Sequence, residues 1–442
     1  MLESFIGASL KLLIEEVERE IEAERKKGEF LYPFYDKYCL SNVPGLILSL
    51  FGVKPRRALP DWAIKANLEI ENVDKVVLIL LDGLSYNRWP LGRESPFFTL
   101  LIKEGVVFPI TSVFPSTTTA ALTTVNTGLT PQEHALLEWY MYFEELDEVV
   151  ATILFSPLGE KYPDRLMEVG VSPNMLFGGR TLYQKLRGEG IVSFSFLSSL
   201  YASGVYSRRL HRGSKLIPFI NFSDLVVALR KMLEKASDPA FFYVYWDAID
   251  AMEHRYGPGG EEQDLELSAL SFLLRTELLS KVKRRVAKET LLLVTSDHGQ
   301  VKVDPQGTVY LNRYRRVLRN LKKGRRGEPI PPTGSSRDVY LHVEPDKLEE
   351  TLELLSKKLR GKAKVVKTFE ALRSGLFGIG KVNKKFYSRA GDLLILPLNG
   401  RTVWYKYPKQ KKAEFRGHHG GLSEEEMLIP FGAVTLSSLQ SR

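Results

Sequence analysis

Three short runs of consecutive apolar residues constrain the fold of this chain most strongly. They are residues 76–81 (VVLILL), 240–245 (AFFYVY) and 291–295 (LLLVT). Strands with one face in solvent alternate apolar and polar residues, whereas continuous apolar runs are typical of strands buried on both faces of a parallel sheet. Helical segments are predicted at 181–187 and 264–287. The sequence therefore predicts an α/β fold, with a mostly parallel central sheet and helices on both faces.

Each apolar run ends in a polar turn that carries an aspartate. Asp82 follows the first run, Asp247 follows the second, and Asp297 and His298 follow the third. An Asp-Gly pair after a strand is, by itself, typical of a turn. In an open parallel sheet, however, ligands bind beyond the carboxyl ends of the strands. We therefore expect functional residues to meet at this edge of the sheet.

Histidines gather in the same kind of cluster. The chain has seven histidines, and four of them, His254, His298, His418 and His419, lie near aspartates or in a glycine-rich turn. Asp250 and His254 are four residues apart, so on a helix they share one face and either ligate a metal or make a surface contact. Carboxylate and imidazole ligands without thiolates suit zinc or manganese. There are enough ligands for two ions, and ions ~4 Å apart are used for in-line displacement at phosphorus.

A threonine-rich stretch, PSTTTAALTTVNTGLTPQEHA at 115–135, requires its own explanation. Threonine is an indifferent helix former, because its β-branch restricts χ1 and its hydroxyl competes for backbone hydrogen bonds. One interpretation is a helix N-terminus capped by Ser116 or Thr117. The other is a nucleophilic hydroxyl at a helix N-terminus, where free N–H groups attract an anion. The stretch alone leaves both interpretations open.

The order of these motifs resembles a known family. Asp82 after a strand, PSTTTAALTTVNTG, DAMEHRYGP, SDHG and HHGG together are similar to the alkaline phosphatase superfamily, and within it to the nucleotide pyrophosphatase/phosphodiesterase branch. The resemblance covers roughly residues 72–300 and 417–434. It implies an alkaline phosphatase-like core and a two-metal hydrolase of phosphoric esters that acts through a phosphothreonine intermediate.

The resemblance also implies roles for individual residues. Thr118 matches the nucleophile, since it lies ten residues before Gly128 of the Thr-Gly pair. Two divalent cations, zinc or else manganese, are implied. One cation would be held by Asp82, Thr118, Asp297 and His298, and the other by Asp250, His254 and His419. His419 is favoured over His418 because it directly precedes Gly420.

Two departures from the branch leave alternatives open. The branch has an asparagine three residues after the nucleophile, where this chain has Ala121, and the loss of such a donor can cost ~2.7–4 kcal/mol of transition-state stabilisation. The segment 300–416 has no counterpart in the resemblance. A phosphomonoesterase, a phosphoglycerate mutase-like enzyme and an inert binding relative therefore remain alternatives. A sulfatase is disfavoured, because Cys39, the one cysteine, lies outside the site pattern.

Four parts are predicted along the chain. They are a helical N-terminal segment packed on the core (1–70), the catalytic core (71–300), an α+β insertion or cap (301–416) and a return to the core (417–442). In the first part, Ile6, Leu10, Leu13, Ile14, Val17 and Ile21 follow helical spacing, and Gly28 is expected to end the helix. In the third part, Asn399-Gly400 predicts a type I′ hairpin between 393–398 and 401–405.

Composition and charge bear on partners and location. No apolar run approaches the ~18 residues of a membrane span, the N-terminus carries acidic residues where a signal peptide would carry basic ones, and a single cysteine fits a reducing compartment. We therefore expect a cytoplasmic protein without membrane attachment, and abundant Lys, Arg and Glu indicate a thermophile. A formal charge of +9 indicates polyanionic partners or substrates, and the resemblance implies a phosphoester small molecule, a nucleotide in particular. The oligomeric state is not predicted.

A basic cluster in the insertion offers a nucleic-acid site as an alternative to a merely solvated basic face. Its members are Arg313, Arg315, Arg316, Arg319, Lys322, Lys323, Arg325 and Arg326.

Overall fold

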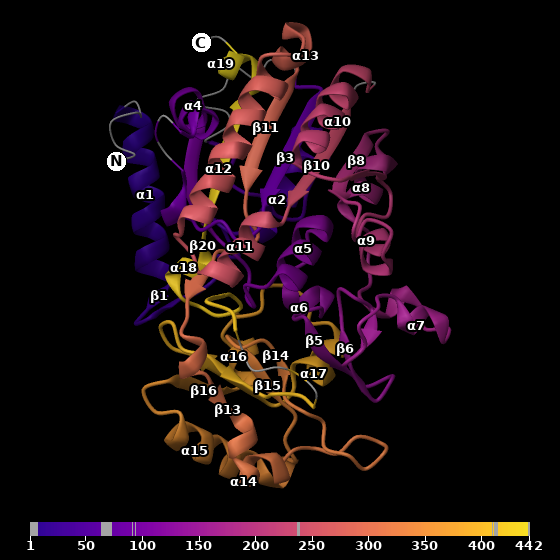
Figure 1. The fold of residues 1–442 in the computed structure, drawn as a ribbon, viewed down its shortest axis with the longest axis vertical. Helices are drawn as coiled ribbons and strands as arrows, with labels where there is room; N and C mark the ends of the chain where they lie inside the picture. Colours follow the sequence, from indigo (N-terminus) through magenta and orange to yellow (C-terminus); the bar gives the residue numbers. More distant parts are fainter. Residues whose placement is uncertain are drawn as a thin grey trace.

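The described chain is built around two seven-stranded sheets that lie one above the other along its long axis (Figure 1). The computed structural model describes residues 8–62, 73–90, 92, 94–236, 239–408, 410 and 414–440. The upper, main sheet is flanked by helices, and the lower, second sheet carries its own smaller set of helices (Figure 1).

The main sheet contains all three apolar runs as neighbouring strands. Its spatial order is β4 (Val106–Thr111), β20 (Leu428–Thr435), β11 (Thr290–Thr295), β3 (Lys75–Leu81), β10 (Ala240–Trp246), β8 (Val192–Ser198) and β9 (Lys215–Phe219). Strand β20 is antiparallel to both of its neighbours, and the pairs from β11 to β9 are parallel. The predicted α/β fold with a mostly parallel sheet is therefore confirmed.

Alternate side chains of β3 enter two different cores, which explains why the run is apolar throughout. Val76, Leu78 and Leu80 pack in one core, and Val77, Ile79 and Leu81 pack in the other. The first core is covered by α1 (Ala8–Arg25), α2 (Val43–Leu50), α5 (Thr118–Thr127), α8 (Leu182–Gly188) and α9 (Val205–Leu210). The second is covered by α4 (Pro96–Glu104), α10 (Phe222–Lys235), α12 (Glu261–Leu273), α13 (Arg284–Lys288) and α19 (Leu436–Gln440).

The predicted helix at 264–287 is wrong in its extent. Helix α12 ends at Leu273, a π-helical turn spans Leu274–Leu279, and α13 begins only at Arg284. The N–H of Ser280 bonds the carbonyl of Arg275, five residues back, which widens the helix locally. Apolar spacing alone does not distinguish such a turn from continued α-helix.

The N-terminal helix agrees with its predicted pattern where it is described. Ile14, Val17 and Ile21 are buried against the core, and Gly28 follows in a left-handed conformation, with φ 64°. Ile6 and the side chain of Leu10 lie outside the described residues. None of the helices in the described part of the chain is both long enough and apolar enough to span a membrane.

The second sheet combines two distant parts of the sequence. Its order is β16 (Ala363–Lys367), β17 (Leu393–Pro397), β15 (Val339–Leu341), β14 (Thr333–Gly334), β5 (Tyr140–Phe143), β6 (Glu148–Ala151) and β7 (Ser156–Pro157). Helices α14 (Arg315–Arg319) and α15 (Leu348–Lys358) pack against it. Residues 140–157 thus complete the sheet of the 301–416 segment, and the four-part division stays a prediction.

The predicted hairpin around Asn399-Gly400 is wrong. Strand β17 already has β15 on one side and β16 on the other, so neither of its edges is available. The chain turns at Asn399, which has φ 47°, and β18 (Val403–Trp404) pairs in parallel with β13 (Val309–Tyr310) instead. The turn residue was identified correctly, but the pairing partner lies elsewhere in the sequence.

A buried ion pair joins the two sheets. Arg337 lies two residues before β15 of the second sheet, and Glu426 lies in α18 (Glu424–Met427), directly before β20 of the main sheet. Two parallel hydrogen bonds connect them, from Nε to Oε1 at 2.9 Å and from Nη2 to Oε2 at 2.7 Å, and both side chains are fully buried. Burial alone would raise the pKa of Glu426, but the charge of Arg337 holds it below its usual value.

We expect Glu426→Gln to lower the free energy of unfolding by ~3–5 kcal/mol, because it leaves the charge of Arg337 buried without its partner. Urea unfolding measures this loss. The exposed pair Arg165–Glu168 provides the control, since Glu168→Gln should cost less than ~1 kcal/mol. Equal losses in the two variants would contradict the role assigned to the buried pair.

Candidate metal centre

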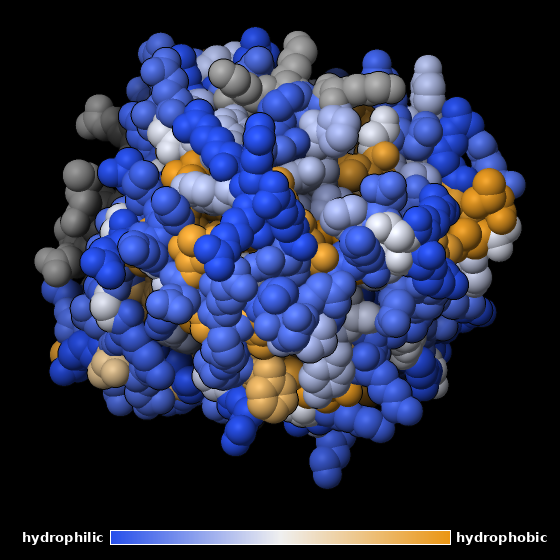
Figure 2. Space-filling model, turned by 90° about the horizontal axis from the view of Figure 1, so that it is seen from below, coloured by the Kyte–Doolittle hydropathy of each residue, from blue (hydrophilic) through white to orange (hydrophobic). Residues whose placement is uncertain are grey.

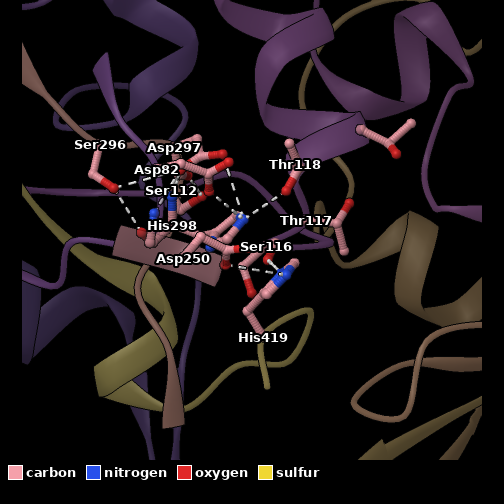
Figure 3. A network of polar contacts seen from close by, with 12 residues as sticks. Asp82, Ser112, Ser116, Thr117, Thr118, Asp250, Ser296, Asp297, His298 and His419 are labelled. Atoms are coloured by element: carbon pink, nitrogen blue, oxygen red, sulfur yellow. Dashed lines mark hydrogen bonds and ion pairs between the residues drawn. The ribbon is translucent and has the colours of Figure 1, made fainter. Parts of the chain in front are cut away.

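The site lies at the carboxyl ends of β3, β10 and β11. Asp82 follows β3, Asp297 and His298 follow β11, and Asp250 lies in the first turn of α11 (Ala248–Tyr256), which follows β10. Figure 3 shows these side chains converging with His419 and with Thr118, the first residue of α5. The edge of the sheet predicted from the sequence therefore carries the cluster.

The cluster contains two groups of closely spaced ligand atoms. Atoms of Asp82, Asp297 and His298 lie within 4.8 Å of one another, and so do atoms of Asp250, His298 and His419. The His254 Nε2 atom lies 3.3 Å from Asp250 Oδ2, beside the second group. His298 belongs to both groups, and its ring stacks on that of His419 with centroids 3.7 Å apart.

Three histidines of the site, His254, His298 and His419, each place the Nδ1 atom beside a backbone carbonyl. The Nδ1 atoms of His254, His298 and His419 lie 2.8, 3.2 and 3.0 Å from the carbonyl oxygens of Gly417, Gly299 and Ser116. A carbonyl only accepts hydrogen bonds, so each Nδ1 carries the proton. In the neutral imidazole each Nε2 then has the lone pair, and it faces the carboxylates. This arrangement is typical of metal-ligating histidine.

In the carboxylates of Asp82 and Asp297, one oxygen accepts hydrogen bonds and the other has no hydrogen-bond partner among the described residues. The Tyr245 hydroxyl donates to Oδ2 of Asp82, and the N–H groups of Gly83 and His298 donate to Oδ1 of Asp297 at 3.2 and 2.9 Å. The remaining atoms, Asp82 Oδ1 and Asp297 Oδ2, are buried without a hydrogen-bond partner among the described residues. A buried carboxylate oxygen without a partner is costly unless a cation binds it.

The pKa values of the cluster favour the binding of cations. Burial raises the pKa of Asp297 to about 6, and burial followed by the charge of Asp297 raises the pKa of Asp82 well above its usual value. Burial also lowers the pKa of His298 to about 4 and that of His419 to about 3. The imidazoles are therefore neutral near pH 7, as metal ligands must be. The donor set fits two divalent cations.

Thr118 is free to face the cluster because its neighbours perform the structural tasks. Thr117 is the N-cap of α5, and its hydroxyl oxygen accepts from the Ala120 N–H at 3.3 Å. Ser116 instead donates to the Gly421 carbonyl at 2.8 Å. Thr118 Oγ1 lies 3.1 Å from His298 Nε2. The capping role and the hydroxyl beside the cluster thus belong to different residues of the same stretch.

Other threonines of α5 form hydrogen bonds within the helix, which explains why the helix tolerates several threonines. Thr123 and Thr127 donate to the carbonyls of Thr119 and Thr123 at 2.7 and 2.6 Å, so their hydroxyls are satisfied within the helix. Ala121, at the position of the asparagine of the branch, is fully buried among apolar side chains.

Tyr245 and Gln300, which hold two of the candidate ligands in place, were not predicted from the sequence. The Tyr245 hydroxyl donates to Asp82, and the Gln300 amide donates to the carboxylate of Asp250 and, at 2.9 Å, to its backbone carbonyl. Tyr245 occurs within an apolar strand run, where nothing marks its hydroxyl as functional. Gln300 directly follows the SDHG motif, and this adjacency is the one available signal.

His418 lies outside both groups of ligand atoms. It belongs to β19 (Gly417–His418), which pairs with β12 (Val301–Lys302). Its ring contacts the edges of His254 and Phe415, with centroids 5.5 and 5.6 Å away. This geometry favours His419 over His418 as a ligand.

Comparisons with known proteins agree in family. The family model described as Type I phosphodiesterase / nucleotide pyrophosphatase matches residues 76–422. The human Ectonucleotide pyrophosphatase/phosphodiesterase family member 1 is 21% identical over 217 residues, covering 48% of this chain and 21% of that protein. The Bis(5'-adenosyl)-triphosphatase ENPP4 of Pongo abelii is 22% identical over 244 residues, covering 54% and 50%. The matched region spans half or less of the length of these relatives.

Solved structures show the same fold. Murine ectonucleotide pyrophosphatase/phosphodiesterase 5 superposes with a TM-score of 0.60 at 19% identity, covering 81% of this chain and 88% of that one. An inactive variant of that murine protein in complex with AMP gives a TM-score of 0.61 at 18% identity, covering 82% and 88%. The alkaline phosphatase-like fold expected from the resemblance is confirmed.

We expect His419→Ala to reduce the divalent cations bound at equilibrium from two per chain to one, with Zn²⁺ as the probe, since it removes an inward-facing Nε2. His418→Ala is the matched control and should keep both ions. Equilibrium dialysis followed by elemental analysis measures the content. Equal zinc content in the two variants would show that His419 is not a ligand.

Proposed function

The chain belongs to the type I phosphodiesterase / nucleotide pyrophosphatase family, and on this premise we propose that it hydrolyses a phosphodiester or pyrophosphate bond of a nucleotide with Thr118 as nucleophile. The observation that carries the proposal is the place of the Thr118 hydroxyl. It stands at the N-terminus of α5, 3.1 Å from His298, beside two groups of metal-ligand atoms.

The site residues divide between two cations in the proposal. One cation would be held by Asp82, Thr118, Asp297 and His298, and the other by Asp250, His254 and His419. Zinc is the proposed metal, with manganese as the alternative, because the ligands are carboxylates and neutral imidazoles. When bound, the cations withdraw charge from the phosphoryl oxygens and favour the alkoxide form of the threonine.

The residues of the chain supply the rest of the chemistry. Oγ of Thr118 forms a bond to phosphorus while the bond from phosphorus to the leaving oxygen breaks, which gives a phosphothreonine. Water then cleaves the phosphothreonine and restores the hydroxyl. Because Ala121 offers no side-chain donor, the N–H groups in the first turn of α5, that of Thr119 among them, are the proposed donors to the phosphoryl oxygens.

A nucleotide is the proposed substrate class, and two printed names support it. The murine relative was solved with AMP, and a second relative is named a bis(5'-adenosyl)-triphosphatase. A phosphomonoesterase requires additional positive groups for a dianionic phosphate, and the resemblance to diesterases does not favour it. A cytoplasmic location remains part of the proposal, supported by Cys39, which is a buried free thiol.

The contacts of the basic cluster in the insertion support a solvated basic face more than a nucleic-acid site. Arg316 pairs with Glu350, Lys322 pairs with Asp392, and Arg325 donates to backbone carbonyls at 3.1 and 3.3 Å. Figure 2 shows the end of the molecule formed by the second sheet as a mostly hydrophilic surface. These contacts favour a solvated basic face.

Thr118→Ala should lower kcat for bis(p-nitrophenyl) phosphate by roughly 10⁴-fold or more, because the nucleophile is lost. The zinc-loaded protein should also turn over this diester faster than p-nitrophenyl phosphate. Steady-state assays of both substrates measure the two effects.

Thr118→Ser, which keeps a hydroxyl, is the matched control and should retain most of the activity. Full activity of Thr118→Ala would remove Thr118 from the mechanism. A preference for the monoester would identify a phosphatase, and no turnover of either substrate by a zinc-loaded chain would indicate a narrow substrate range or an inert relative.

A further inference from the structure

Two buried carboxylates lie behind the loop that carries His419. Glu138 lies two residues before β5, and Asp338 directly precedes β15. Strand β14 pairs with both β5 and β15, which brings these two side chains together from positions 200 residues apart. Glu138 is 1% exposed and Asp338 is 0% exposed. Neither takes part in the proposed hydrolysis.

In Glu138 and Asp338, as in Asp82 and Asp297, one carboxylate oxygen accepts a hydrogen bond and the other has no partner among the described residues. Oε2 of Glu138 accepts from the Trp139 N–H at 2.6 Å, and Oδ1 of Asp338 accepts from the Ser335 hydroxyl at 2.6 Å. Oε1 of Glu138 and Oδ2 of Asp338 are buried without a hydrogen-bond partner in the described part of the chain. The hydroxyl of Tyr340, which is 1% exposed, is also buried without a partner there.

The nearest basic residue in the sequence does not neutralise this pair. The guanidinium of Arg337 is bound to both oxygens of Glu426 and also donates to the carbonyls of Asn399 and Arg401. Burial raises the pKa of Glu138, and burial followed by the charge of Glu138 raises the pKa of Asp338. Two carboxylates buried together require either protons or a cation.

The absence of a side chain at Gly420 allows oxygens of Asp338, Ser335 and Glu138 to approach its backbone closely. A Cβ at this position would stand 2.7 Å from Asp338 Oδ1, 2.7 Å from Ser335 Oγ and 3.4 Å from Glu138 Oε1. Gly420 also has φ 118°, which disfavours any other residue. Oxygens from three separate side chains therefore pack against Gly420, and any larger residue would displace them.

We propose that Glu138, Asp338 and Ser335 form a binding site for a third cation, Ca²⁺, beside Gly420. An all-oxygen set with two carboxylates suits a hard cation, in contrast to the imidazole-rich cluster in front of it. Ca²⁺ is favoured over Mg²⁺ because it accepts irregular geometry at ~2.3–2.6 Å, whereas Mg²⁺ demands a near-ideal octahedron at ~2.0–2.1 Å. Ser335 Oγ lies 3.5 Å from the His419 carbonyl, so the cation would brace the His419 loop.

The test is a titration of Ca²⁺ into the zinc-loaded chain, in which the front cluster is already filled. Isothermal titration calorimetry and equilibrium dialysis with radioactive calcium should both give one Ca²⁺ per chain. Glu138→Gln and Asp338→Asn, which preserve shape, should each weaken binding at least tenfold. Asp392 directly precedes β17 of the same sheet and is paired with Lys322, so Asp392→Asn is the matched control and should bind Ca²⁺ like the parent chain.

The parent chain alone keeps the proposal falsifiable if a variant fails to fold. No Ca²⁺ uptake by the zinc-loaded parent chain would overturn the site and would leave a shared proton as the explanation of the pair. Uptake that is equal in all four proteins would also overturn it, because the ion would then lie elsewhere. The proposal is independent of the proposed hydrolysis, since no outcome depends on activity.

Discussion

The arrangement of the site depends on Glu426. Its carboxylate binds Arg337 of the second sheet and accepts the N–H of Gly421 at 2.9 Å, two residues after His419. Its backbone carbonyl accepts the N–H of Gly299 at 2.9 Å, next to His298. One residue thus holds the second sheet and both turns that carry the stacked histidines. Since a charge buried in this way is stable only with its partner, the relative position of the His298 and His419 turns depends on this bridge.

The local sequence was sufficient to predict the three central strands of the main sheet, β11, β3 and β10, and the meeting of the chemical groups at their ends. Apolar runs mark strands buried on both faces, and parallel strands present their carboxyl ends at one edge, so Asp82 and Asp297 had to lie close together. Thr118 and His419 were predicted only through the resemblance to a family, because α5 and the 417–421 turn reach that edge by tertiary packing. The assignment of each ligand to one cation remains a prediction.

The second sheet and the supporting residues could not be predicted, for a physical reason. Strand pairing is decided by contacts between distant segments, and nothing local in Tyr140 indicates that it pairs beside Gly334. The Asn399 turn is a true local signal, yet the strand before it was already paired on both sides. Glu138 and Asp338 illustrate the same limit, since each separately is an ordinary acidic residue at the start of a strand.

The position of β20 has a consequence for how the chain becomes folded during synthesis. This strand is inserted between β4 and β11, although it follows all the other strands of the main sheet in the sequence. Until residues 428–435 leave the ribosome, β4 has no partner on that side and β11 presents an unpaired edge. Between the synthesis of β11 and that of β20 the nascent chain therefore carries two exposed edges, and chaperone binding in this period would protect it from aggregation.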